Sequence, residues 1–105
     1  ALDVVVLTTY PLATGIVVDA RPVAIMHMID AGEADEKVIA VPVNDPRWSD
    51  VKDLADINKH TLKEIAHFFA TYKQVQGKEV QVGEFKDRAA AEAATRRLID
   101  GIIKA

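Results

Sequence analysis

The stretch Met28-Ile29-Asp30-Ala31-Gly32-Glu33-Ala34-Asp35-Glu36-Lys37-Val38-Ile39-Ala40-Val41-Pro42 decides how this chain folds. Apolar runs lie on both sides of its acidic centre, at residues 23–28 and 38–43. Runs rich in Val and Ile are typical of strands, and Ala31-Gly32 is a turn signal. We therefore expect an acidic loop between two strands of one sheet, with Lys37 where the second strand begins.

The acidic residues of this expected loop have two interpretations. Closely spaced carboxylates that point inward need a cation, and their oxygens suit hard ions such as Mg²⁺, Mn²⁺ or Ca²⁺. A lysine a few residues away then suits a phosphate bridging to those ions. Solvated turns carry the same charges and are the commoner case, so spacing alone leaves both interpretations open. The pattern from Asp30 to Glu36 does not fit an EF-hand loop.

Composition limits the classes of protein to which the chain can belong. Its 105 residues are enough for one domain with a modest core. The net charge is −3 and there is no basic stripe, which argues against nucleic acid as the main partner. The absence of cysteine excludes disulfides, thiolate metal sites and a cysteine nucleophile, and it fits a reducing compartment. No apolar run approaches the roughly 20 residues that span a bilayer.

Hydrophobic periodicity predicts strands in the first half of the chain and helices in the second. We expect strands at 3–8, 16–28 with a bend at Arg21-Pro22, 37–43 and 78–85, a turn at 10–15, and helices at 59–74 and 88–103. Strands followed by helix, strand and helix predict an α+β fold that is mostly β, a small barrel or curled sheet with helices packed outside.

Both helices have predicted caps and apolar faces. In the first, Thr61 and Glu64 fit a capping box that would start the helix two residues later. In the second, Asp87 is a good N-cap. The expected apolar faces are Leu62, Ile65, Ala66, Phe69 and Tyr72 in the first helix, and Ala91, Ala94, Leu98 and Ile102 in the second.

Six segments, in order and at the expected spacings, carry a resemblance to a known family. They are Ala1-Leu2-Asp3-Val4, Ala20-Arg21-Pro22-Val23, the acidic stretch 28–42, Asp45-Pro46-Arg47-Trp48, Val51-Lys52-Asp53-Leu54, and His67-Phe68-Phe69 through Tyr72-Lys73. Together they resemble the C-terminal two-thirds of a soluble family I inorganic pyrophosphatase. The resemblance implies a single domain over 1–105, part of a small OB-like five-stranded barrel that here lacks its N-terminal strands, with two packed helices.

The same resemblance implies an activity and a site. The activity is hydrolysis of pyrophosphate to two phosphates by water that Mg²⁺ activates, with Mn²⁺ or other divalent cations as substitutes. It implies metal ligation by Asp3, Asp30 and Asp35, and catalytic roles for Asp3, Asp35 and Lys37. Lys37, Tyr72 and Lys73 are implied to bind phosphate. It also implies a cytoplasmic homo-oligomer, hexameric or trimer-based, with no nucleic acid or membrane partner.

Each of these residues also has a structural interpretation. Asp3 fits a strand end, Asp30 and Asp35 fit turns, and Lys37 fits an exposed charge at a strand end. Tyr72 lies on the apolar helix face, so it is partly core, and Lys73 fits a solvated helix position.

The resemblance also leaves part of the family's machinery unmatched. The first two aspartates of the family's signature, together with its earlier lysine, arginine, glutamates and tyrosine, would precede Ala1. We therefore expect the 105-residue chain on its own to be nearly inactive. A barrel module that binds divalent cations and phosphate without turnover is the alternative, and a purely structural role is a third possibility.

Overall fold

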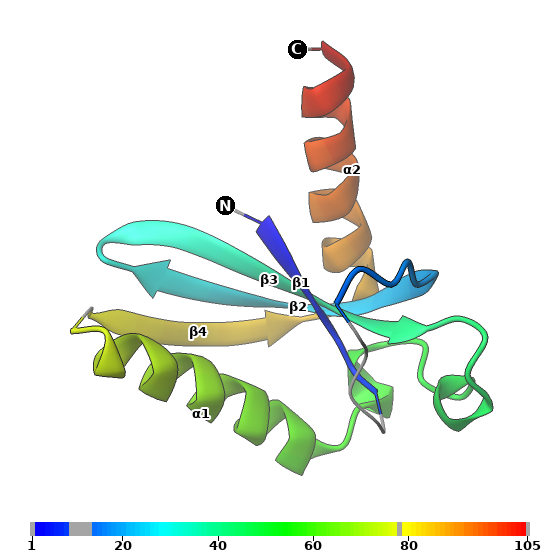
Figure 1. Cartoon of the computed structure of the whole chain (residues 1–105), viewed down its shortest axis with the longest axis horizontal. Helices are drawn as coiled ribbons and strands as arrows, with labels where there is room; N and C mark the ends of the chain where they lie inside the picture. The colour runs from blue at the N-terminus through cyan, green and yellow to red at the C-terminus, as the bar shows by residue number, and fades with distance from the viewer. Residues whose placement is uncertain (1, 9–13, 78, 105) are drawn as a thin grey trace.

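A computed structural model describes residues 2–8, 14–77 and 79–104, without the side chains of Leu2, Lys73 and 101–104. Most of the turn expected at 10–15 lies outside these residues. The described residues form a sheet with two long helices and two short 3-10 helices (Figure 1). The strands are β1 (Leu2–Val6), β2 (Ala20–Asp30), β3 (Glu33–Pro42) and β4 (Val80–Lys86); the helices are η1 (Pro46–Trp48), η2 (Leu54–Asp56), α1 (Lys59–Val75) and α2 (Arg88–Lys104).

The strand order in the sheet is β1-β3-β2-β4. β2 pairs antiparallel with both β3 and β4, whereas β1 pairs parallel with β3 and places Asp3 opposite Lys37. β2 begins at Ala20 and has a bulge between Pro22 and Ala24. A bend at the proline was therefore predicted correctly, but the strand starts four residues later than expected.

The acidic stretch is a hairpin and not a loop, which corrects the sequence-based expectation. Only Ala31 and Gly32 separate β2 from β3, with φ of 51° and 82°. Two successive positive φ values are typical of the tight turns whose twist matches that of paired strands. The second strand begins at Glu33 and not at Lys37, so Asp35 and Lys37 are inside it. The prediction failed because consecutive charges concealed an alternation between the two faces of a strand.

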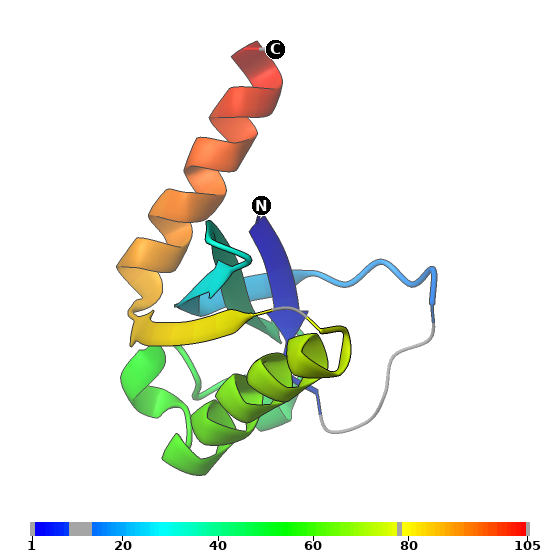
Figure 2. The ribbon, with the colours of Figure 1, turned by 90° about the vertical axis from the view of Figure 1, so that its left-hand side faces the viewer.

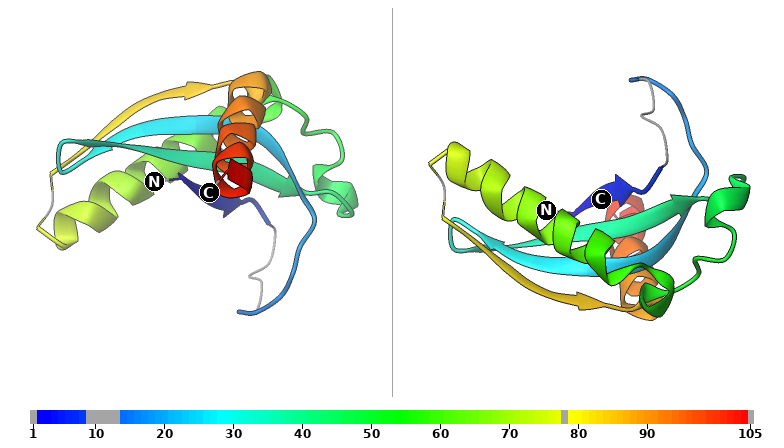
Figure 3. Two further views of the ribbon diagram at one scale, coloured as in Figure 1. Left: turned by 90° about the horizontal axis from the view of Figure 1, so that it is seen from above. Right: turned by 90° about the horizontal axis from the view of Figure 1, so that it is seen from below.

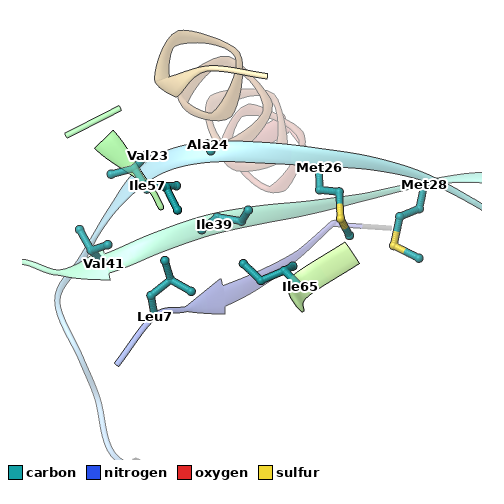
Figure 4. Close-up of a cluster of buried hydrophobic side chains, with 9 residues drawn as sticks. All are labelled: Leu7, Val23, Ala24, Met26, Met28, Ile39, Val41, Ile57 and Ile65. Atoms are coloured by element: carbon teal, nitrogen blue, oxygen red, sulfur yellow. The ribbon is translucent and has the colours of Figure 1, made fainter. Parts of the chain in front are cut away.

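The two faces of the sheet carry separate apolar clusters. One cluster includes Met26, Met28 and Ile39 and packs against Ile65 of α1, as Figure 4 shows. The other joins Ile25 and Val38 to α2 through two alanines. The helices therefore cover opposite faces, with α1 crossing below the sheet and α2 rising from its other side (Figures 1 and 3).

The helix boundaries are close to those expected. Asn58 Oδ1 accepts a hydrogen bond from His60 N at 2.8 Å, so α1 begins at Lys59 and the later capping-box start is wrong. Asp87 caps α2 as predicted, because its Oδ1 accepts from Ala90 N at 3.1 Å.

The predicted apolar stripe of α2 is only partly buried. Ala91 and Ala94 are buried, but Leu98 is 48% exposed, because α2 extends away from the sheet beyond its first turns (Figure 2). The side chain of Ile102 lies outside the described part of the chain. The burial of α2 therefore depends on its first half.

The observed architecture confirms the α+β, mostly β class with two packed helices. No helix in the described ranges is long and apolar enough to cross a membrane.

Candidate metal and phosphate site

Four predicted site residues lie on the α1 side of the sheet. Residues that pair across strands point to the same face, and side chains alternate along each strand. Asp35 pairs with the buried Met28, and Asp3 pairs with Lys37, two residues further along β3. Asp30 is two residues beyond Met28, at the end of β2. The parallel pairing of β1 thus brings together side chains more than 30 positions apart.

Lys37 is the centre of this group. Its ammonium donates a hydrogen bond to Asp3 Oδ2, and its Nζ lies 3.1 Å from Asp35 Oδ2. The side chains of Lys37 and Asp35 are only 7% and 11% exposed, whereas that of Asp3 is 62% exposed. Lys37 and Asp35 therefore lie at the buried end of the group, and Asp3 on β1 lies at the end that is open to solvent.

An aromatic ring completes the surroundings of the lysine. The Lys37 ammonium lies over the Phe69 ring of α1, 5.3 Å from its centroid. A cation on a ring face gains from the quadrupole of the ring, more so when it is desolvated. Helical periodicity placed Phe69 in the core, but nothing in its spacing connects it to Lys37, so its position under the charge was missed.

The surroundings of Lys37 affect its pKa in opposite directions. Burial lowers the pKa, but hydrogen bonds and attraction from Asp3 and Asp35 outweigh it and raise the pKa above the usual 10.5. Lys37 is therefore a permanent cation at neutral pH. The interpretation of Lys37 as an exposed strand-end charge is wrong.

The donor atoms of the pair suit a hard divalent cation. Asp35 Oδ1 is buried and accepts no hydrogen bond in the structure, while Oδ2 of the same carboxylate faces Lys37. A buried carboxylate oxygen without a donor is costly, and a cation is one way to compensate it. Asp3 adds a second carboxylate beside it. The residues present therefore fit a cation of the Mg²⁺ type.

Asp30 and Tyr72 are the remaining predicted site residues whose side chains the structure describes. Among residues 2–8, 14–77 and 79–104, no three His, Asp or Glu side chains form a group that could hold one ion. Asp30 thus shares the face without completing a three-carboxylate site. Tyr72 is 49% exposed and stacks on Phe68, with ring centroids 5.7 Å apart, beside an open groove on α1. Lys73 is within α1, but its side chain lies outside the described residues.

Comparison with known proteins gives one consistent family. A family model described as "Inorganic pyrophosphatase" matches residues 1–102. An inorganic pyrophosphatase of Halalkalibacterium halodurans is 52% identical over 99 residues, which cover 94% of this chain and 58% of that protein. One from Geobacillus stearothermophilus is 45% identical over 102 residues, covering 97% of this chain and 59% of that protein.

Solved structures give the same result. An inorganic pyrophosphatase from Helicobacter pylori superposes with a TM-score of 0.89 at 40% identity, over 93% of this chain and 59% of that one. The enzyme from Thermus thermophilus gives 0.77 at 43% identity, over 82% of this chain and 51% of that one. The chain therefore spans less than two-thirds of the length of these relatives.

Proposed function

Because the chain belongs to the inorganic pyrophosphatase family, we propose that the protein hydrolyses inorganic pyrophosphate to two phosphates with the aid of Mg²⁺. The observation that carries the proposal is the meeting of Asp3 and Asp35 around one buried lysine. We assign both carboxylates to metal binding, and Asp30 with Asp35 to a further ion that arrives with the substrate. Mn²⁺ is the expected substitute.

The acidic residues of the site bind metal, and the basic residues bind phosphate. Asp3 and Asp35 supply hard oxygen ligands for the metal. Bound Mg²⁺ supplies charge neutralisation and the activation of water. Lys37 carries the positive charge that faces the phosphoryl oxygens, and its permanent protonation suits that role. We assign Tyr72 and Lys73, at the end of α1, to the outer phosphate.

The domain organisation, localisation and oligomeric state of the protein are part of the same proposal. We propose that 1–105 is a single domain belonging to a larger pyrophosphatase barrel, in a cytoplasmic homo-oligomer that is hexameric or trimer-based. Exposed apolar side chains support assembly, among them Phe68 at 57% and Val75 at 83% exposure.

One observation favours a second function. Asp3, Asp35 and Lys37 bring two carboxylates and one ammonium into a single group. Such a group also fits a module that binds a divalent cation and phosphate without turnover.

Phosphate release from pyrophosphate by the whole pyrophosphatase to which residues 1–105 belong, with and without Mg²⁺, tests the proposal. Calorimetric titration with Mn²⁺ followed by phosphate runs in parallel. Mg²⁺-dependent turnover supports the hydrolase, and binding without turnover supports the module. The absence of both binding and turnover would refute both functions.

A further inference from the structure

The Lys37 ammonium occupies a position that resembles a cation site. Oxygens of Asp3 and Asp35, from two different strands, both approach it, and the Phe69 ring lies on another side. The side chain is 7% exposed, so little solvent reaches the charge. The Lys37 charge thus lies between two carboxylates, of which Asp35 is buried and Asp3 is open to solvent.

A divalent cation that bound the lysine-facing oxygens of the same two carboxylates would need that position. Mg²⁺ binds carboxylate oxygens at about 2.1 Å, a shorter distance than any hydrogen bond. The oxygens that face Lys37 are Asp3 Oδ2 and Asp35 Oδ2. An ion bound between those two oxygens would lie next to the ammonium, and two cations at that separation repel strongly.

We propose that Lys37 is a built-in competitor of the divalent cation: it holds the Asp3–Asp35 pair together in the absence of metal and must leave that pair when the metal binds. The inference rests on the proposed function for the identity of the ligands. Metal affinity is then set partly by the cost of displacing the ammonium. The displaced ammonium becomes available to a phosphate oxygen, so metal loading and phosphate capture use one side chain in sequence.

Titration of the protein with Mn²⁺ in the absence of phosphate tests the proposal. Electron paramagnetic resonance measures the Mn²⁺ that remains unbound at each step. Lys37→Met removes the competitor and keeps an apolar stem of similar length. Lys86→Met makes the same charge change on β4, opposite Ile25, where Lys86 is 52% exposed and its ammonium lies 3.9 Å from Glu84. We expect Lys37→Met to bind the first Mn²⁺ about tenfold more tightly or better, and Lys86→Met to bind as the wild type does.

The outcomes separate the inference from the proposed function. If the wild type binds Mn²⁺ and Lys37→Met binds it equally or more weakly, Lys37 is no competitor, while the proposed function stands. If neither protein binds Mn²⁺, the metal site and the inference both fail. Equal tightening in Lys37→Met and Lys86→Met assigns the effect to net charge and also overturns the inference.

A second measurement needs no variant, because Lys37→Met leaves Asp35 buried without its cation and could prevent folding. Acetylation of lysines in the wild type is followed by mass spectrometry with and without Mg²⁺. We expect Mg²⁺ to raise the acetylation rate of Lys37 severalfold and to leave that of Lys86 unchanged. Unchanged or slower Lys37 acetylation under conditions where Mg²⁺ binds would overturn the proposal.

Discussion

Replacing Asp35 by asparagine separates the chemical role of this carboxylate from its structural role. The substitution removes one negative charge and keeps the shape of the side chain. The Asp35–Lys37 attraction at 3.1 Å corresponds to about 5 kcal/mol at an effective dielectric constant of 20. Much of this gross energy is offset, because Asp3 still accepts from Lys37, the amide oxygen of asparagine can accept as well, and a buried charge no longer has to be desolvated.

We therefore expect a small structural cost and a large functional one. Unfolding free energy should fall by about 1–2 kcal/mol, near the value of one charged hydrogen bond. Mn²⁺ affinity should fall about 100-fold or more, since even residues behind metal ligands change affinity 10- to 100-fold. In the whole pyrophosphatase to which residues 1–105 belong, the rate of pyrophosphate hydrolysis should fall by several orders of magnitude.

Glu36→Gln is the matched control, because it makes the same chemical change one residue away on the opposite face of the sheet. Glu36 faces His27 and Arg97, 3.8 and 3.9 Å from its Oε2. Urea unfolding measures stability and calorimetry measures Mn²⁺ affinity. Equal Mn²⁺ affinities in Asp35→Asn and Glu36→Gln, with both folded, would refute the assignment of Asp35 as a ligand.

Three further predictions concern stability, measured by urea unfolding. Ala31→Gly should stabilise the fold by about 0.5–1 kcal/mol, because φ of 51° strains an L-residue; a loss of stability would contradict the turn geometry. Gly83→Ala should cost about 1–3 kcal/mol, because a Cβ there would lie 2.9 Å from the carbonyl oxygen of His27; an unchanged midpoint would show that β4 can shift. The pKa of Lys37 is raised above 10.5 in the folded state, so its ion pairs stabilise the protein below pH 10.5 and that contribution is lost as the pH rises through the folded pKa. The wild type should therefore lose more stability above pH 10.5 than Lys37→Met, and parallel losses would contradict this.

The helices were predictable because their signals are local. Apolar spacing defined α1 almost to its ends, and Asp87 marked the start of α2. The exposure of Leu98 was not predictable, because an apolar stripe does not reveal how far along a helix its partner extends. Local patterns thus gave the elements but not the extent of their packing.

The site was predictable as a set of residues but not as a geometry. Asp35 and Lys37 looked like loop charges because an alternation of faces is hard to detect in a run of acidic and basic residues. Their grouping with Asp3 depends on the parallel pairing of β1 with β3. Phe69 reaches Lys37 only because α1 packs across that face. These relations are tertiary, so no spacing in the sequence could show them.

Under the proposed function, Asp3 and Asp35, distant in sequence, hold one cation together. A double-mutant cycle of Mn²⁺ binding with Asp3→Asn, Asp35→Asn and the double variant tests it most directly. We expect Asp3→Asn to lose about tenfold or more in affinity, Asp35→Asn about 100-fold or more, and the double variant to be little worse than Asp35→Asn alone. Losses that multiply in the double variant, or no loss in either single variant, would contradict a shared site.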